Sequence, residues 1–328
     1  MFDIITFGSA TQDIILKPKH ITMLKYDKAM DPVLGTEVCF PMGSKVEVED
    51  IMFNSGGGGT NTAATFALQG FKTAFCGTVG TDVSGQEIVN ELKKLKVDIS
   101  LVQKTDKKRT NHSIVILNGG QDRTILAYRG AAEIMNKKDI PFGKLKTKWL
   151  YLAPLSGLLC DNFEGLVNYA FDKKIKIAAN PSIAQLSLPN FAEIANKIDV
   201  LILNQEEASF LTKISYEQEK EIFAKIDAMH PGITVMTRGG DGVVVSDGKH
   251  IYTAIPPVDR NIVDTTGAGD AFGSGFISEF MQSANIEKAM QLGMGNSVGC
   301  LSKIGAKNGL LKKREKFQVV EVKKEEIR

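Results

Sequence analysis

Two acidic residues lie six positions apart in the segment DTTGAGDAFGSG, and small residues fill most of the interval between them. The acids are Asp264 and Asp270. Three aromatic residues then follow at intervals of four, Phe272, Phe276 and Phe280, so they share one face of a predicted helix that packs against the core. This helix must start close to Asp270, directly after a turn that is rich in glycine.

The predicted helix start consists of Gly267, Ala268 and Gly269, whose backbone N–H groups have no intrahelical partners. The helix dipole is positive at the same end, and glycine lets an anion approach the backbone, so the segment predicts a phosphate site. Asp270 beside that anion could accept a proton from an attacking hydroxyl group. Its alternative role is to complement the helix dipole from the first turn.

A second glycine-rich segment, FNSGGGGTNTAATFALQG, leads into another predicted helix early in the chain. Gly57 lies in the glycine run, and Asn61 lies at the start of the helix. A run of this kind serves either close packing or ligand contact, and the pattern leaves both open. Because no Lys-Ser or Lys-Thr pair follows the glycines, the segment is not a Walker A loop.

Asn204 and Glu207 follow a buried strand in the segment LILNQEEASFL. Oxygen ligands at the carboxyl end of a strand suit Mg²⁺ together with water and phosphate. The same two residues also fit a helix N-cap followed by a first-turn acid.

A glycine turn joins two predicted strands in VMTRGGDGVVVSDG, where Thr237 ends the first strand and Gly239 and Gly242 form the turn. The need for a tight turn explains such glycines by itself. The same turn could also pass beneath a nucleotide.

Composition and spacing exclude several classes of protein. The formal net charge is only +2 and basic residues are spread along the chain, so no nucleic-acid partner is indicated. GAGDAFG lacks the spacing of a dinucleotide-binding loop, and the four histidines form no metal or triad pattern. The four cysteines are far apart, which predicts buried free thiols. No apolar run reaches the ~20 residues of a membrane span and no signal peptide is evident, so we expect a cytoplasmic protein.

Strand-like and helical segments alternate from FDIITFGSA to GITVMTRGG, which predicts an α/β fold with a mainly parallel sheet covered by helices on both faces. Residues 12–54 and 111–129 interrupt this pattern with short β-like pieces, the second a hairpin around the turn NGGQ. We expect the two segments to form a small separate sheet. Because no linker or repeat is visible, residues 1–328 are predicted to form one domain, with a solvated tail around a strand at 317–322.

Taken in this order, GGGGTNTA, NQEE, TRGGDG and DTTGAGDAF resemble the ribokinase-like (PfkB) family of sugar and nucleoside kinases. The resemblance extends from FGSATQD to about Gly309. It implies a ribokinase-like fold in which the two β segments form a lid that closes over the sugar and often supplies a dimer interface. It also implies that the turn at Gly267, Ala268 and Gly269 is the anion hole and that Asp270 is the catalytic base.

On the nucleotide side, the resemblance assigns the remaining motifs one by one. Asn204 and Glu207 match residues that organise Mg²⁺ and phosphate. Thr237, Gly239 and Gly242 match the turn beside the ATP phosphates and ribose, and Asn296 lies about where the family contacts adenine.

On the acceptor side of the site, Asp13, Gly57 and Asn61 match residues that hold sugar hydroxyl groups. Asp264, with the carbonyl of Thr266, matches a segment that binds a monovalent cation such as K⁺ in many members, although lysine replaces this cation in some relatives.

The chain departs from ribokinase at Gly58, where ribokinase carries a lysine that contacts the sugar, and this weakens ribose as the specific substrate. Arg109 and Arg129 either meet a carboxylate or phosphate on the acceptor or are solvated lid residues.

The sequence therefore predicts an ATP-dependent sugar kinase that phosphorylates a hydroxymethyl group. A nucleoside kinase is the nearest alternative, since TEVCFP with Met42 and Phe53 offers apolar material to shelter a base. A phosphosugar kinase and a nucleotide sensor without turnover are less favoured. We expect ATP, Mg²⁺ and a small acceptor as ligands, a homodimer through the lid, and neither nucleic acid nor membrane as a partner.

Overall fold

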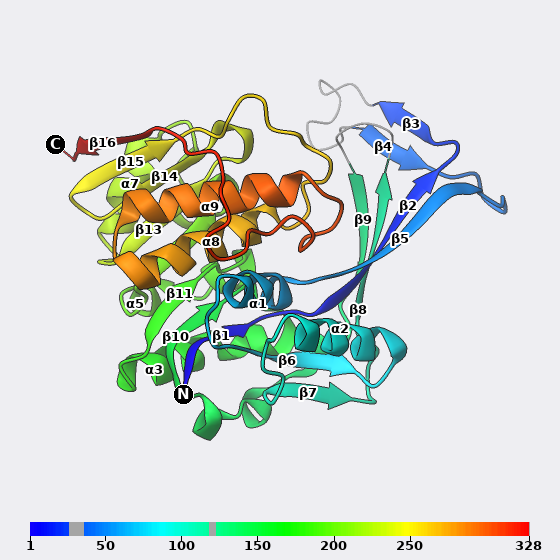
Figure 1. Ribbon diagram of the computed structural model, residues 1–328, viewed down its shortest axis with the longest axis horizontal. Coiled ribbons are helices and arrows are strands. Elements are labelled where there is room, and N and C mark those ends of the chain that lie inside the picture. The colour runs from blue at the N-terminus through cyan, green and yellow to red at the C-terminus, as the bar shows by residue number, and fades with distance from the viewer. Residues whose placement is uncertain (26–35, 118–122, 328) are drawn as a thin grey trace.

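The computed structural model describes residues 1–25, 36–117 and 123–327. Figure 1 shows a core of helices and strands, from which a smaller group of blue and teal strands projects. Within the described ranges, none of the helices combines the length and the apolar character that a membrane span requires.

The core is built on a sheet with the following strands: β1 (Phe2–Phe7), β6 (Thr73–Gly80), β7 (Val102–Thr105), β10 (Thr147–Leu152), β11 (Lys176–Ala179), β12 (Val200–Asn204), β13 (Ile233–Thr237), β14 (Val243–Ser246), β15 (His250–Ala254) and β16 (Val322–Glu326). Their order in this ten-stranded sheet is β16-β15-β14-β13-β12-β11-β10-β1-β6-β7. The strands from β13 to β7 pair in parallel, and β14, β15 and β16 add antiparallel strands at one edge. The inner strands are buried along almost their whole length, because helices cover both faces.

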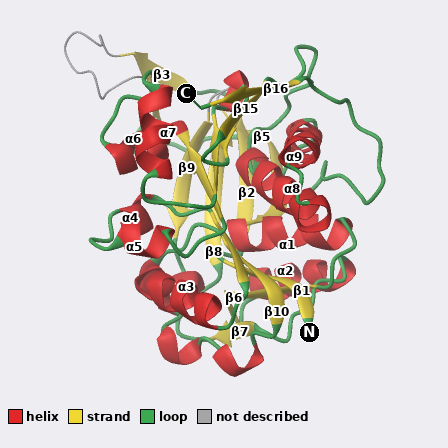
Figure 2. Cartoon of the chain, turned by 90° about the vertical axis from the view of Figure 1, so that its left-hand side faces the viewer, coloured by secondary structure: helices red, strands yellow, loops and turns green. Residues whose placement is uncertain are grey.

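Helices lie on both faces of this sheet, as Figure 2 shows. One face carries α3 (Phe163–Asp172), α4 (Ile183–Leu186), α5 (Phe191–Ala195), α6 (Gln205–Thr212) and α7 (Glu219–Asp227), and the other carries α1 (Gly58–Leu68), α2 (Val83–Lys94), α8 (Ala268–Ser283) and α9 (Ile286–Leu301). Short 3₁₀ helices lie in the connections: η1 (Ala131–Ile134), η2 (Lys137–Asp139), η3 (Phe142–Lys144), η4 (Gly157–Asn162) and η5 (Gly239–Asp241). Side chains alternate between the two cores, so Ile5 packs with Phe163 of α3 whereas Ile4 packs with Phe272 of α8.

The smaller strand group forms a second sheet of β2 (Thr11–Pro18), β5 (Val48–Gly56), β8 (Asn111–Leu117) and β9 (Arg123–Tyr128). We call it the lid sheet; its strand order is β5-β2-β8-β9, and β3 (Thr22–Lys25) pairs with β4 (Thr36–Cys39) beside it. Several of its apolar side chains are exposed, among them Ile51, Phe53, Ile125 and Leu126 at 46–64%.

The mainly parallel sheet, its two helical layers and the separate small sheet are confirmed. The predicted strand at 317–322 is wrong in position, because β16 begins only at Val322. There the backbone pairs with the open edge of β15, and this pairing outweighs the weak strand preference of the charged residues that follow. The predicted turn NGGQ lies outside the described residues.

Candidate active site

The N-terminal end of α8 has no side-chain cap. Its N-cap residue, Gly267, has a φ of 78°, and a Cβ atom at that position would lie 2.4 Å from the Cβ atom of Ala306. Only glycine fits both the left-handed backbone and this close approach. The first turn of α8, with Ala268 and Gly269, therefore has the open N–H groups and the positive dipole end that suit an anion.

Asp270 lies in this first turn and is held from α1. Its Oδ2 atom accepts a hydrogen bond from Asn61 Nδ2 at 2.9 Å. Burial raises the pKa of Asp270, while the hydrogen bond from Asn61 and the positive charge of Lys307 oppose that rise. A buried carboxylate with a raised pKa is a stronger base than one in water, so the group suits proton abstraction.

The same asparagine has an unused acceptor. Asn61 Oδ1 is buried, and it has no hydrogen-bond partner in the described part of the chain. Unpaired buried polar atoms are uncommon in proteins and cost stability. A ligand hydroxyl group beside Asp270 would supply the missing donor.

A cavity of about 350 Å³ lies beside the start of α8. The turn after β13 contributes Thr237, Gly239 and Gly242 to its wall, and α8 contributes Ala268 and Gly269. The lining also includes Arg260, Met294, Ser297 and Val298. The structure thus brings two of the predicted motifs together around one space, which backbone groups and apolar side chains line together.

Asn296 does not line this cavity. It is fully buried, and its Nδ2 atom donates to the carbonyl of Ala271 at 2.7 Å and to Thr65 Oγ1 at 3.2 Å. Its Oδ1 atom accepts from the backbone of Leu311. Its neighbours along α9, Met294 and Val298, line the cavity instead, and the sequence reasoning missed them.

Asn204 and Glu207 form a reciprocal capping box at the start of α6. Asn204 Oδ1 accepts from the Glu207 backbone, and Glu207 Oε2 accepts from the Asn204 backbone, both at 2.8 Å. Burial raises the pKa of Glu207, and the hydrogen bond from Asn204 opposes the rise. The N-cap alternative is thus realised, but one carboxylate oxygen of Glu207 makes no bond within the box.

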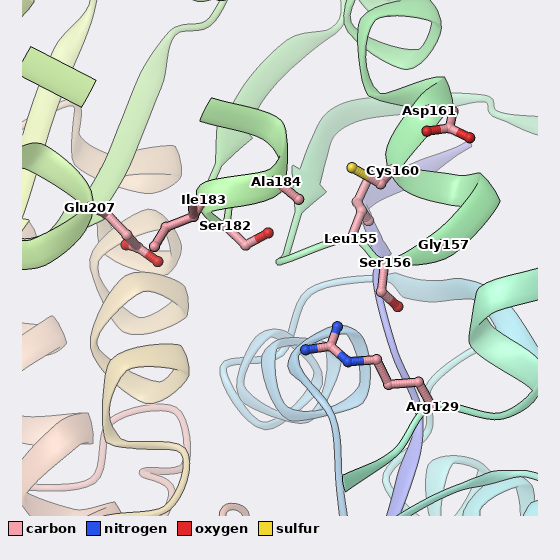
Figure 3. A pocket seen from close by; sticks show the side chains of 10 residues that line it. All are labelled: Arg129, Leu155, Ser156, Gly157, Cys160, Asp161, Ser182, Ile183, Ala184 and Glu207. Carbon is pink, nitrogen blue, oxygen red and sulfur yellow. The ribbon is translucent and has the colours of Figure 1, made fainter. Parts of the chain in front are cut away.

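Glu207 also lines a second cavity of about 490 Å³, shown in Figure 3. Ser156 and Ser182 contribute hydroxyl groups, and the side chain of Arg129 extends into the space from the end of β9. Carboxylate, hydroxyl and guanidinium groups therefore face one another at the carboxyl edge of the main sheet.

Asp264 and Thr266 lie in the loop before α8. The Asp264 carboxylate accepts the backbone N–H of Thr266 and that of Gly305, both at 2.9 Å. The Thr266 carbonyl lies 3.4 Å from Cys300 Sγ, and Thr266 Oγ1 is buried without a hydrogen-bond partner among the described residues. Oxygen atoms thus gather at this loop. Across the described ranges, no three His, Cys, Asp or Glu side chains converge as a metal-binding group.

Asp13 and Gly57 lie where the lid sheet joins the core. Asp13 is only 6% exposed, and burial raises its pKa to about 6 although Ser113 and Lys307 act in the opposite direction. Gly57 is the N-cap of α1 and has a φ of 94°. Asp13, Gly57 and Asn61 therefore come from two neighbouring segments beside Asp270.

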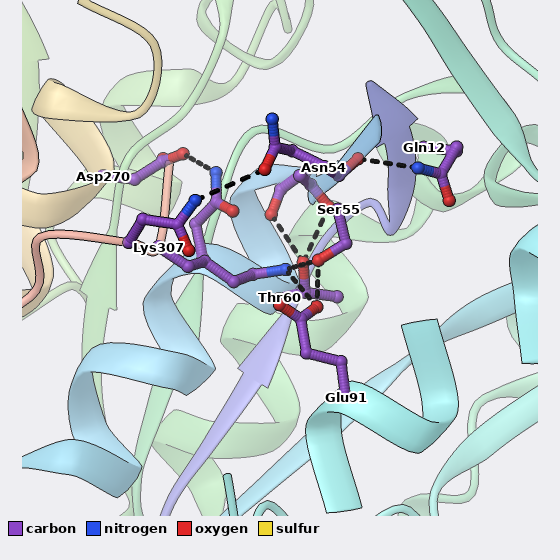
Figure 4. Close-up of polar contacts among 11 residues, drawn as sticks. Gln12, Asn54, Ser55, Thr60, Glu91, Asp270 and Lys307 are labelled. Atoms are coloured by element: carbon purple, nitrogen blue, oxygen red, sulfur yellow. Dashed lines mark hydrogen bonds and ion pairs between the residues drawn. The ribbon is translucent and has the colours of Figure 1, made fainter. Parts of the chain in front are cut away.

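Like Arg260, a second charged residue escaped the sequence reasoning. Lys307, in the loop after α9, reaches Ser55 and Glu91, and Figure 4 draws this contact in one close-up with Asp270. Its only sequence signal is a lone lysine among small residues in IGAKNG.

The raised pKa of Asp13 predicts a stability change that depends on pH. The folded protein holds the proton of the Asp13 carboxyl group more tightly than the unfolded chain does. The contribution of Asp13 to the free energy of unfolding is therefore lost as the pH rises from about 4 to about 6. Asp13→Asn cannot ionise, so we expect it to raise the free energy of unfolding at pH 7.5 by roughly 1–3 kcal/mol and to change it less at pH 4.5. Urea unfolding at both pH values measures this. Asp50→Asn, an exposed acid on β5, is the control, and an equal effect of Asp13→Asn at both pH values would contradict the prediction.

Comparisons with known proteins bear on the family and the fold of this chain. The family model described as pfkB family carbohydrate kinase matches residues 21–313. A ribokinase of Haemophilus influenzae is 25% identical over 312 residues, which cover 92% of this chain and 99% of the relative. A cytidine kinase of Thermococcus kodakarensis is 27% identical over 81% of this chain and 92% of its own length.

A solved structure of Arabidopsis thaliana ribokinase complexed with ribose and ATP superposes with a TM-score of 0.78 at 20% identity, and the match covers 95% of this chain and 96% of that one. This likeness concerns the fold, which is ribokinase-like. Because the family model matches residues 21–313, which is most of the chain, the chain belongs to the pfkB family of carbohydrate kinases.

Proposed function

We propose that this protein transfers the γ-phosphate of ATP to a hydroxymethyl group of a free sugar. The observation that carries this proposal is the position of Asp270 in the uncapped first turn of α8, hydrogen-bonded to Asn61 and next to a cavity lined by backbone and apolar groups. A base and an anion site within one helical turn are what phosphoryl transfer to a hydroxyl group requires.

In this mechanism the acceptor hydroxyl donates its proton to Asp270. Asn61 orients the Asp270 carboxylate through Nδ2, and its Oδ1 atom accepts a hydrogen bond from a second hydroxyl group of the sugar. Asp13 accepts a hydrogen bond from a third hydroxyl group. The N–H groups of Ala268, Gly269 and Asp270 stabilise the charge that develops on the transferring phosphoryl group. Gly269 leaves space for the phosphate, since nothing lies within 4 Å of a Cβ atom placed there.

The nucleotide would occupy the cavity between the β13 turn and α9, with its phosphates toward α8. Thr237, Gly239 and Gly242 would lie beside the ribose and phosphates. Glu207 and Asn204 would hold Mg²⁺ through water, because one Glu207 oxygen is not used by the capping box. When bound there, Mg²⁺ would neutralise negative charge on the phosphates.

A free sugar is favoured over a nucleoside as the acceptor. Asp13 and Asn61 offer partners for sugar hydroxyl groups, whereas the apolar candidates for a base shelter are open to solvent, with Phe53 64% and Met42 100% exposed. The nucleoside alternative draws support from the similarity to the cytidine kinase. Arg129 in the second cavity would suit a sugar that carries a phosphate or a carboxylate.

We also propose that the whole chain acts as one kinase domain in a cytoplasmic homodimer. The exposed apolar side chains of the lid sheet, such as Ile51 and Leu126, suit a second copy of the chain, and all four cysteines are free thiols. Sedimentation at micromolar protein concentration distinguishes this dimer from a monomer. A monomer would contradict the proposed dimer.

An acceptor screen tests the proposed function directly. Values of kcat/KM for ribose, fructose, sugar acids, sugar phosphates and three nucleosides should be highest for a free sugar. Phe53→Ala should weaken nucleoside binding more than sugar binding if this side chain lines a base pocket. A nucleoside preferred by about a hundredfold, equivalent to roughly 2.7 kcal/mol, would overturn the sugar assignment but not the phosphoryl transfer.

Asp270→Asn should separate chemistry from nucleotide binding. Turnover should fall by roughly 10²–10⁴, the usual contribution of a positioned base, because the amide cannot take the proton. ATP affinity should stay within a few-fold, because the anion site consists mainly of backbone. Steady-state kinetics and ATP titration measure the two effects, and more than a tenth of wild-type turnover in the variant would rule out Asp270 as the base.

The loop around Asp264 should make the activity depend on a monovalent cation. We expect higher activity in KCl than in tetramethylammonium chloride at equal ionic strength, since Asp264 and the Thr266 carbonyl would hold K⁺ behind the start of α8. Asp264→Ala should abolish the difference, and Asp259→Ala, an exposed acid in the same loop, should retain it. Equal rates of the wild type in both salts would exclude a working cation site.

A further inference from the structure

Lys307 places a positive charge in a part of the site where the neighbouring charged side chains are acidic. Its side chain is only 5% exposed, and Nζ lies 2.5 Å from Ser55 Oγ and 3.3 Å from Glu91 Oε2. Ser55 Oγ also donates to the Glu91 carboxylate. Figure 4 shows this three-residue contact in the same close-up as Asp270. Asp13 lies against Gly56, the residue after Ser55, where a Cβ atom would lie 2.1 Å from Asp13 Oδ2.

A buried ammonium group needs close negative charge, because removal from water costs several kcal/mol. Glu91 supplies only part of this charge, since its own side chain is 37% exposed and solvent screens it. Burial lowers the pKa of Lys307, and the charges of Glu91, Asp13 and Asp270 oppose this lowering. Lys307 in turn acts to lower the pKa of Asp13 and of Asp270. The lysine is thus shared among three acids from α2, β2 and α8.

The loop that carries Lys307 is held in place on both sides. Gly305 donates to Asp264, and the Leu311 carbonyl accepts from Gln69 Nε2 at 2.7 Å. Gly309 packs so closely on α9 that a Cβ atom there would lie 1.9 Å from the Gly299 carbonyl oxygen. A fixed loop keeps the ammonium group at one position instead of letting it follow Glu91 into solvent.

We propose that Lys307 is a positioning residue of the acceptor site, whose buried ammonium group, anchored by Ser55 and Glu91, balances the negative charge of Asp13 and Asp270 while the acceptor and the nucleotide phosphates occupy the site. This proposal rests on the function proposed above. Its physical basis is a balance of charge: phosphate brings further negative charge toward Asp270, and without Lys307 the base would retain its proton.

The groups that bear on this balance come from every neighbouring element. They are Glu91 on α2, Asp13 on β2, Tyr151 on β10, Cys300 on α9, Asp264 in the loop before α8, and Asp270 itself. Among the described residues, Lys307 is the cation whose charge lowers the pKa of both Asp13 and Asp270.

Lys307→Met tests the proposal through the pH profile. Loss of the positive charge raises the pKa of Asp270, so the acid limb of kcat/KM should move up by about one pH unit, and activity on that limb should fall roughly tenfold. Ser55→Ala removes the anchor but not the charge and should leave the limb near its wild-type position. Lys303→Met removes an exposed lysine from the same loop and should have no effect.

Lys307→Cys followed by alkylation with bromoethylamine restores an amine of similar length and should return the limb toward the wild type. Wild-type protein treated in the same way controls for its own thiols. An unshifted limb in Lys307→Met, or an equal shift in Ser55→Ala, would overturn the proposal in favour of a merely structural role.

A measurement without turnover separates this proposal from the proposed function. In urea unfolding at pH 7.5, Lys307→Met should destabilise the Asp270→Asn protein less than it destabilises the wild type, because the charge pair is already lost. If Lys307→Met lowers the free energy of unfolding equally in both backgrounds, Lys307 and Asp270 do not interact. That result would overturn the role proposed for Lys307 even if the kinase is active. If the wild type phosphorylates no acceptor, the proposed function fails, while this cycle still decides whether Lys307 and Asp270 interact.

Discussion

The hydrogen bond from Asn61 to Asp270 joins two residues that lie 209 positions apart in the chain, and the rest of the site depends on it. It forms only because α1, α8 and α9 pack closely. A Cβ atom on Gly275 would lie 3.0 Å from Asn296 Cβ, and one on Gly293 would lie 3.0 Å from the Phe272 carbonyl oxygen. Small residues at these contacts let α8 and α9 approach closely, and on α1 a Cβ atom at Gly58 would lie 3.4 Å from Asp270 Oδ1.

A buried polar side chain, that of Asn296, fixes the arrangement of the helices around this hydrogen bond. Asn296 is fully buried, and it makes hydrogen bonds to α1, to α8 and to the segment that follows α9. A buried amide of this kind is costly in any different packing, because its donors and acceptors would lose their partners. Asn296 thus connects α1, α8 and the segment after α9 beside the helix that carries Asp270.

Most of the fold could be predicted from the sequence, because hydrophobic periodicity determines the type and order of the elements. Candidate site residues could be identified from the sequence where the local pattern is unusual: Asp270 follows a glycine turn, and Glu207 follows a buried strand. Lys307 and Arg260 could not, since a single basic residue in a loop has no local signature and its neighbours in the fold are distant in sequence. At Asn296 the family resemblance pointed to this segment, but the direction of the side chain, which does not line the cavity, could not be known from the sequence.

The main sheet ends in two strands that differ from its interior. β7 has four residues, and β16 has the sequence VKKEE with its charged side chains exposed. Unpaired backbone at a sheet edge can pair with a strand of a second molecule, and short or highly charged edge strands oppose such pairing. Without β16, the edge would be β15, whose sequence HIYTA is far less charged. β16 therefore covers the edge of β15 with a short charged strand, and such a strand opposes pairing with a second molecule.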